Sequence, residues 1–352
     1  MTNNKVLILG PGPLTFSGGV QNYYKLFFAK QSIGATYFCQ SDVRIKNKIH
    51  KAIYFIYAYL RFVFMVTKFD IVVLNPSMYK SCLYRDSIYI RIARLFDKKT
   101  IVFWRGFNRT WFREKASVKY IHLMQQTFFK ANHTIVLSKS FYEDLRSVGC
   151  NTPYSVETTM ISSDILLKEK RKFNEQSITL LFLARLKKTK GIFETLKIYD
   201  KLKQKFDSIK LVIAGDGDAY FEVEEYIKDN NLKDIIMLGN VVDEKKFNAY
   251  KNADIYLFPS YFEGMPSSVL EAMAMGLPIV CSSVGGLPDF FQQEKMGYMV
   301  NGLDVDDYVE CITKIISDKT FQQISDFNIE YAKRYFLDDN VIKRIENTFL
   351  NL

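Results

Sequence analysis

Short apolar runs alternate with longer amphipathic stretches along the whole 352-residue chain. This rhythm is typical of strands that alternate with helices, and strands covered on both faces by helices form parallel sheets. The apolar runs predict strands over 5–10, 71–74, 100–104, 134–137, 177–184, 210–214, 235–238, 254–259 and 278–282. The amphipathic stretches predict helices over 20–30, 116–130, 140–148, 191–204, 219–230, 244–251 and 306–317. We therefore expect an α/β fold.

The chain is long enough for two domains of ordinary size, each with its own core. We place the boundary near residues 160–176, where the charged run KEKRKFNEQ lacks periodic apolar spacing. The prediction is a first domain over 1–165, a second over 166–328, and amphipathic helix over 329–352. Five scattered cysteines without a C-x-x-C spacing support neither a disulfide framework nor a zinc site. The first residues lack a signal peptide's apolar region, so we expect a cytoplasmic protein.

Residues 254–278 carry the most specific local pattern. A strand ends near Pro259, and a helix is predicted to begin with Pro266 at its first position and to end at Gly276. The start of such a helix offers unpaired N–H groups to an anion. Glu263 and Glu271 lie at the same junction and would repel a phosphate unless they bind something else. The junction therefore predicts a site for a ligand with both phosphate and sugar hydroxyl groups.

The run PSYFEGMPSSVLEAMAMGLPIV resembles the donor-site motif of the large retaining glycosyltransferase family 4. Other segments resemble further motifs of that family, and the number and order of the matches argue against coincidence. These segments are FLARLKKTKG at 182–191, LVIAGDGD at 211–218, MLGNV at 237–241, and GGLP at 285–288 followed by Gly297-Tyr298. The resemblance implies a GT-B fold, in which two Rossmann-like domains face each other across a cleft. It also implies that the C-terminal helix crosses back onto the N-terminal domain.

The same resemblance implies roles for individual residues. Glu271 would hold the ribose hydroxyls of a nucleotide-sugar donor, and Glu263 would contact the transferred sugar. Arg185 and Lys190 would stabilise the departing diphosphate. Further donor contacts are expected from Gly264, Met265, Ser267, Ser268, Gly239, Asn240, Val241, Gly18 and Gly19. Members of this family need no metal and no cofactor besides the donor, and no Asp-x-Asp motif is present.

The N-terminal half follows the family less closely. Its glycine-rich turn, GPGPLTFSGGV, has the geometry that both a β–α turn and a diphosphate site require. Arg105 stands where many relatives have a histidine near the transferred sugar, which leaves the acceptor side open. Arg105, Arg109 and Arg113 are candidates for binding an acceptor phosphate, and Trp104 is a candidate for stacking on sugar or lipid. The alternative is that the arginines are surface residues and the indole is part of the core.

Charge is divided unevenly between the two halves. Residues 1–165 hold 23 Lys and Arg against 9 Asp and Glu, a net charge of +14, and residues 166–352 hold 25 against 29. Such asymmetry points to an anionic partner of the N-terminal half, and without a nucleic-acid motif we rank a membrane surface above nucleic acid. The apolar part of segment 44–68 runs from Ile53 to Val66, which is shorter than the ~20 apolar residues that a membrane-spanning helix needs. It predicts either a buried helix that leads into strand 71–74 or a helix in the plane of a membrane.

Together these features predict a retaining glycosyltransferase that uses a UDP- or GDP-sugar. The expected acceptor is a glycan or a polyprenyl-diphosphate-linked saccharide in surface polysaccharide biosynthesis, at the cytoplasmic face of an anionic membrane. Two alternatives stay open: a catalytically silent sugar-nucleotide-binding subunit, which the missing histidine favours, and a nucleotide-sugar epimerase with the same two-domain shape.

Overall fold

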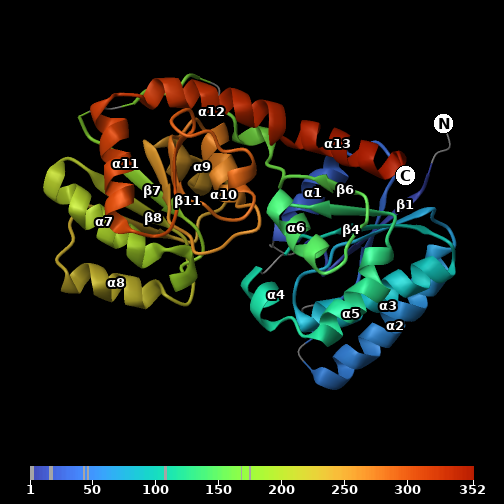
Figure 1. The fold of residues 1–352 in the computed structure, drawn as a ribbon. Helices are drawn as coiled ribbons and strands as arrows, with labels where there is room; N and C mark the ends of the chain where they lie inside the picture. The colour runs from blue at the N-terminus through green and yellow to red at the C-terminus, as the bar shows by residue number, and fades with distance from the viewer. Residues whose placement is uncertain are drawn as a thin grey trace. The chain divides into compact units, whose positions relative to one another are not determined.

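The computed structural model divides the chain into two compact units (Figure 1). Unit 1 consists of Met1–Met160 and Asp338–Leu352, and unit 2 of Ile161–Leu337. For comparison, the sequence placed the domain boundaries at 165/166 and 328/329. The residues whose structure is described are 4–15, 19–42, 44–45, 47–106, 109–167, 169–173 and 176–352.

Unit 1 is built on a six-stranded parallel sheet in the order β2-β1-β3-β4-β5-β6. Two of its inner strands, β1 and β3, are completely apolar and buried, as expected for strands with helices on both faces. The strands are β1 (Val6–Gly10), β2 (Thr36–Cys39), β3 (Ile71–Leu74), β4 (Lys99–Phe103), β5 (His133–Val136) and β6 (Tyr154–Val156).

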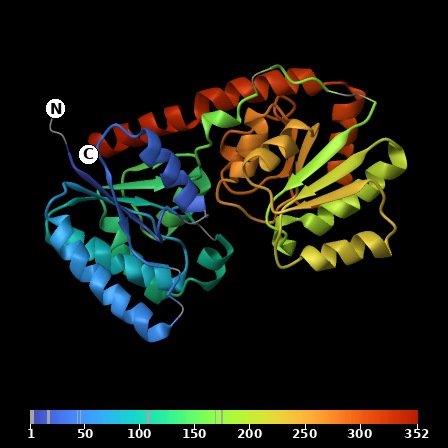
Figure 2. The same ribbon diagram turned by 180° about the vertical axis from the view of Figure 1, so that it is seen from behind.

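Seven α-helices are described in unit 1. They are α1 (Gly19–Lys30), α2 (Lys48–Val66), α3 (Lys80–Leu95), α4 (Arg109–Lys115), α5 (Val118–Gln126), α6 (Lys139–Ser147) and α13 (Asp338–Leu350). Helices α2, α3 and α5 lie side by side on one face of the sheet, with α3 in the middle (Figures 1 and 2). The apolar segment within 44–68 is thus a helix that leads into β3. Only three of its residues, Ala58, Phe62 and Val66, are buried.

Unit 2 repeats this architecture around a parallel sheet in the order β12-β11-β10-β7-β8-β9. Its strands are β7 (Thr179–Leu183), β8 (Lys210–Ala214), β9 (Ile235–Gly239), β10 (Ile255–Phe258), β11 (Ile279–Ser282) and β12 (Gly297–Val300). The helices are α7 (Ile192–Lys205), α8 (Tyr220–Asp229), α9 (Asp243–Lys251), α10 (Ser267–Ala274), α11 (Val305–Ser317) and α12 (Phe321–Tyr335). Because β10 and β7 are parallel neighbours, the loops that follow them meet at the same edge of the sheet.

The charged run at the predicted boundary is partly built into unit 2. Arg171 is buried, and its guanidinium donates hydrogen bonds to the carbonyl oxygens of Met275 (2.9 Å), Ala253 (2.5 Å) and Tyr250 (2.7 Å). Burial lowers the pKa of Arg171 to about 10. Arg171 thereby supplies hydrogen-bond donors to carbonyl oxygens at the C-terminal ends of α9 and α10. This part of the charged run is therefore not a solvated linker.

The last two helices pack against different units. Helix α12 packs on α10 in unit 2. Helix α13 packs on α1 in unit 1, where Phe349 contacts the ring of Phe27 and a carboxylate oxygen of Glu346 accepts a hydrogen bond from the hydroxyl of Ser32 at 2.7 Å. The C-terminal segment is therefore an integral part of the N-terminal fold.

Candidate functional site

The junction between β10 and α10 is formed by a buried strand, a short loop and a helix start. All four residues of β10 are buried, so the strand fixes where the loop begins. Pro266 is the N-cap of α10, with extended φ and ψ of −72° and 108°, and Ser267 is the first helical residue. The expectation that Pro266 occupies the first helical position was thus wrong by one residue. Gly276 ends the helix as predicted, with a left-handed φ of 75°.

Glu263 lies in the loop of this junction and is paired with Lys190. The Lys190 Nζ is 2.5 Å from Oε1 of Glu263, and the hydroxyl of Ser260 donates to the same oxygen at 3.0 Å. Both charged side chains are mostly buried. Lys190 is followed by Gly191 at a φ of 78°, where an added Cβ would lie 1.8 Å from the carbonyl oxygen of Pro259. Only glycine at this position permits the close approach of the two loops.

Glu271, on α10, is held by two residues of α9. Its carboxylate accepts from Lys246 Nζ at 2.7 Å and from the hydroxyl of Tyr250 at 2.9 Å. Tyr250 is fully buried, and burial raises the pKa of its phenol well above the usual value, so the phenol stays a donor. Lys246 and Tyr250 were missed in the sequence. Their spacing of four residues puts them on one face of a helix, but nothing local indicates that this face meets α10.

These pairs neutralise the two carboxylates of the junction. Arg185 adds a third cation on the loop that follows β7. The five side chains together carry a net charge of +1. The arrangement therefore offers carboxylate oxygens to sugar hydroxyls and positive charge to a diphosphate.

Two glycines from a later loop fix the backbone beside Glu263. The N–H of Gly286 donates to the carbonyl oxygen of Gly264 at 2.8 Å. Gly285, at a φ of 62°, approaches so closely that an added Cβ would lie 2.2 Å from the same oxygen. The GGLP motif thus has a structural function, because it holds the loop that carries Glu263.

We expect Gly285→Ala to destabilise unit 2 by roughly 2–5 kcal/mol, from left-handed strain together with the steric overlap. The matched control is Gly239→Ala. Gly239 has nearly the same φ, 63°, but nothing within 4 Å of an added Cβ, so only the strain of about 1–2 kcal/mol applies. Thermal unfolding followed by circular dichroism measures both. Equal shifts in Tm for the two variants would show that the contact with Gly264 does not matter.

The other expected donor contacts lie at the same edge of the unit 2 sheet. Gly239 ends β9, and its carbonyl oxygen accepts from the N–H of Gly215 at 2.7 Å. Val241 is buried and Asn240 is exposed. Met265, Ser267 and Ser268 belong to the β10–α10 junction already described.

The candidate residues of unit 1 have different environments. Gly18 lies outside the described residues, and Gly19 is the first residue of α1. Trp104 is 1% exposed and packs on Phe128, so its indole is part of the core of unit 1. The guanidinium of Arg105 lies over the ring of Tyr23, 3.6 Å from its centre, and its Nη1 is buried without a hydrogen-bond partner.

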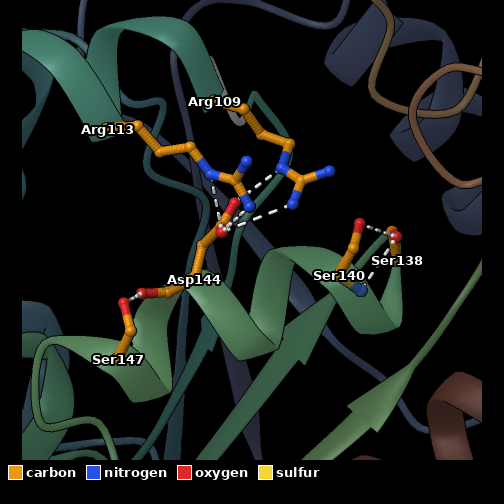
Figure 3. Close-up of polar contacts among 6 residues, drawn as sticks. All are labelled: Arg109, Arg113, Ser138, Ser140, Asp144 and Ser147. Carbon is orange, nitrogen blue, oxygen red and sulfur yellow. Dashed lines mark hydrogen bonds and ion pairs between the residues drawn. The ribbon is translucent and has the colours of Figure 1, made fainter.

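Arg109 and Arg113 converge on one buried carboxylate (Figure 3). The Nε of Arg109 is 2.6 Å from Asp144, and the Nη2 of Arg113 is also 2.6 Å from it. The arginines belong to α4 and the aspartate to α6, so the cluster ties together two helices that follow neighbouring strands. Two guanidinium groups against one carboxylate leave a positive charge at this edge of the sheet.

The three histidines have positions that fit structural roles. His133 lies in β5, 3.0 Å from the hydroxyl of Ser155, and burial lowers its pKa. His50 is in the first turn of α2 and His122 in α5, both exposed. Within the described ranges, no group of three or more His, Cys, Asp or Glu side chains is arranged to hold a metal ion.

Comparisons with known proteins bear on the family and the fold of the chain. Residues 164–334 match the sequence model of the family glycosyl transferases group 1. The chain is 29% identical to the uncharacterized glycosyltransferase MJ1607 of Methanocaldococcus jannaschii, over 66% of this chain and 63% of that protein. It is 31% identical to the amylovoran biosynthesis glycosyltransferase AmsK of Erwinia amylovora, over 52% of this chain and 49% of that protein. The chain thus spans less than two thirds of the length of these relatives.

The fold comparison covers nearly the whole chain. The structure of Anabaena Alr3699/HepE in complex with UDP aligns over 99% of this chain and 100% of that one, with a TM-score of 0.77 and 16% identity. The predicted fold of two Rossmann-like domains is therefore confirmed. Residues 164–334 thus match the glycosyl transferases group 1 family, and the chain that carries them has the α/β fold of GT-B glycosyltransferases.

Proposed function

We propose that the protein is a retaining glycosyltransferase that takes a sugar from a UDP- or GDP-linked donor. The observation that carries this proposal is the pair of lysine-neutralised carboxylates at the β10–α10 junction, Glu263 with Lys190 and Glu271 with Lys246. A site for phosphate alone has no use for two carboxylates. A site for a nucleotide sugar needs acceptors for hydroxyl groups and cations for the diphosphate at the same place.

In this proposal each residue of the site has a role in the transfer. Glu271 accepts hydrogen bonds from the ribose hydroxyls, and Glu263 contacts the transferred sugar. Arg185 and Lys190 stabilise the negative charge that develops as the bond between the sugar C1 and the diphosphate oxygen breaks. On the same face of the sugar, the acceptor oxygen forms the new bond to C1, and its proton passes to the departing phosphate oxygen. This route retains the anomeric configuration and needs no histidine as general base.

The comparisons support the chemical class of donor and acceptor. HepE is described in complex with UDP, and AmsK is named for the biosynthesis of amylovoran. By analogy with these proteins, we propose a nucleotide-sugar donor and a glycan or polyprenyl-diphosphate-linked acceptor in surface polysaccharide biosynthesis. The acceptor would be reached at the cytoplasmic face of an anionic membrane, with Arg105 and Arg109 as candidates for its phosphate groups.

We further propose that no divalent metal takes part, because Arg185 and Lys190 supply the charge that a metal supplies elsewhere. Transfer is then expected to proceed at an unchanged rate after removal of divalent ions with EDTA. The assay measures nucleoside diphosphate release before and after chelation, and again after Mg²⁺ is added back. A loss of activity with EDTA that Mg²⁺ restores would contradict this part of the proposal.

The proposal is tested by a panel of UDP-, GDP- and ADP-sugars. One of them is expected to raise the Tm, since a ligand that binds only the folded state stabilises it by mass action, and to be hydrolysed slowly without acceptor. The released sugar should keep the anomeric configuration of the donor in NMR spectra. Tight binding without turnover would instead indicate a silent binding subunit. An epimerised nucleotide sugar as product would indicate an epimerase.

A further inference from the structure

Helix α2 has two apolar faces, one packed against unit 1 and one exposed to solvent. Its inner face, Ala58, Phe62 and Val66, packs into unit 1. Its outer face carries large apolar side chains that are each between 56% and 75% exposed. They are Ile49, Ile53, Ile56, Tyr57, Leu60 and Phe64. Their spacing of three and four residues makes one continuous stripe, which runs about 22 Å along the helix.

The neighbouring helix α3 extends this apolar surface. Tyr84, Ile88 and Leu95 are exposed at the same helical spacing, and the two helices are in contact, with the hydroxyl of Tyr59 3.3 Å from the carbonyl oxygen of Arg85. We call the exposed apolar residues of α2 and α3 the α2–α3 surface. A contiguous exposed apolar patch of this extent is typical of a binding surface.

The exposed charges on helices α2 and α3 themselves are all positive, whereas two exposed carboxylates, Asp70 and Asp97, follow the C-terminal ends of the two helices. Helix α2 contains no acidic residue, and Asp86, the single acidic residue of α3, is buried and paired with Arg85 at 2.7 Å. The exposed cations of the two helices and of the turn after α2 are Lys48, Lys51, Lys68, Lys80, Arg91 and Arg94. An apolar stripe with a cationic rim complements a bilayer that contains anionic lipids. A second copy of the same surface would bring like charges together, which disfavours a symmetric dimer.

Aromatic side chains mark one end of the surface. Tyr84 contacts the ring of Tyr120, and Lys119 and Lys80 lie over these two rings at about 6 Å. Rings of this kind beside lysines are enriched where a bilayer's apolar layer meets its headgroups. A helix that connects parallel strands runs back from the C-terminal edge of the sheet, so the Lys48 end of α2 lies at the C-terminal edge of the unit 1 sheet, the edge at which α/β sheets generally bind ligands.

The structure also indicates the orientation of α2. By length and composition alone the 19-residue α2 is able to cross a membrane, so the expectation that this segment is too short was wrong; within the described residues it is the one helix of which this holds. Its inner face is nevertheless fixed to unit 1. The guanidinium of Arg61 donates to the carbonyl oxygen of Cys39 at 3.0 Å and lies over the ring of Phe38. Crossing the bilayer would break these contacts, whereas lying in its plane keeps them.

We propose that the α2–α3 surface binds an anionic lipid bilayer with α2 parallel to the membrane plane. This deepens the proposed function, because it assigns to named residues the membrane contact at which a lipid-linked acceptor is met. The sequence left open whether residues 44–68 contact core or membrane. Both interpretations hold, each for one face of α2: the inner face packs in the core of unit 1, and the outer face is exposed and can bind lipid.

Sedimentation with lipid vesicles tests the surface. The full-length protein is expected to bind vesicles that contain phosphatidylglycerol, more weakly at high salt, and to bind pure phosphatidylcholine vesicles poorly. Phe64→Ser should weaken binding on the order of tenfold, and Lys48→Gln and Lys51→Gln by about fivefold each. The matched controls are on α8 of unit 2: Phe221→Ser, at an 80% exposed phenylalanine, and Lys228→Gln should leave binding unchanged. Absence of vesicle binding, or equal losses in variants and controls, overturns the proposal.

Depth-dependent quenching by brominated lipids tests the orientation. Tryptophan is placed in turn at Ile49, Ile56 and Phe64, which span the stripe. A helix in the plane of the membrane gives the same shallow depth at all three positions, whereas a spanning helix gives a deep position between two shallow ones. Sedimentation velocity without lipid tests the alternative that the α2–α3 surface joins two copies of the chain. A dimer that Phe64→Ser dissociates would overturn the proposal in favour of self-association.

These measurements are independent of sugar transfer. Donor stabilisation in the panel of nucleotide sugars should be the same for Phe64→Ser and for the unaltered protein. Vesicle binding without any effect of a nucleotide sugar would contradict the proposed function alone. A nucleotide-sugar effect without vesicle binding would contradict this inference alone.

Discussion

Replacing Glu263 by glutamine is expected to lower kcat for sugar transfer by about 100- to 1,000-fold, the usual cost of removing one group that stabilises a transition state. The amide keeps the size of the side chain but removes the negative charge that pairs with Lys190 at 2.5 Å. Lys190 then lacks its partner, and the transferred sugar loses its carboxylate contact. Initial rates of nucleoside diphosphate release at saturating donor measure the effect.

The control for Glu263→Gln is an ion pair of similar length on the surface of the same unit. Lys201 and Asp306 are 2.6 Å apart and largely exposed, and such pairs contribute little. Asp306→Asn should therefore leave kcat and Tm nearly unchanged. A Glu263→Gln variant that folds normally and turns over as fast as the Asp306→Asn variant would remove Glu263 from the mechanism.

Replacing Glu271 by alanine is expected to raise the KM for the donor by about 10- to 100-fold, with a smaller change in kcat. The ribose is distant from the reacting bond, so its contacts are the same in the ground state and the transition state. The substitution also leaves Lys246 and the buried hydroxyl of Tyr250 without their acceptor. Steady-state kinetics over a range of donor concentrations separate KM from kcat.

The control for Glu271→Ala is Glu222→Ala on α8. Glu222 is paired with Lys188 at 2.6 Å, but both side chains are exposed. Its removal should alter neither constant. If Glu271→Ala lowered kcat while the KM stayed the same, Glu271 would act at the reacting centre and not on the nucleotide.

The sequence predicted those parts of the fold that depend on local pattern. The bounds of β3 and β8 were predicted to the residue, since each contains an uninterrupted aliphatic run with polar residues or glycine on either side. Three strands, β2, β6 and β12, were not predicted, because each is an edge strand with a mixed sequence (TYFC, YSV and GYMV) and not a run of aliphatic residues. Helix α3 was also missed, and its N-cap residue, Tyr79, makes no side-chain capping bond that would mark its start.

The candidate site was predictable where its residues share one motif. Glu263 and Glu271 lie within nine residues of each other, so a single segment indicates both. Their partners come from elsewhere in the chain: Lys190 is 73 residues from Glu263, and Lys246 is 25 residues from Glu271. Those pairings depend on how α9, α10 and the loop after β7 pack, which no local pattern encodes.

The same limit applies to unit 1. Arg109 and Asp144 are 35 residues apart, so their ion pair follows from the packing of α4 on α6. An apolar stripe on both sides of α2 indicates in sequence that the helix is either buried or bound to lipid. Only the packed structure shows that α3 and the sheet cover one side and leave the other exposed.

The central claim is that the β10–α10 junction of unit 2 binds the nucleoside diphosphate of a sugar donor. Isothermal titration calorimetry with UDP, GDP and ADP, without divalent metal, tests it most directly. We predict that one of them binds one site with a Kd on the order of micromolar, that Glu271→Ala weakens this binding, and that Glu222→Ala does not. Absence of binding by all three nucleotides, or binding that is unaffected by Glu271→Ala, would contradict the account.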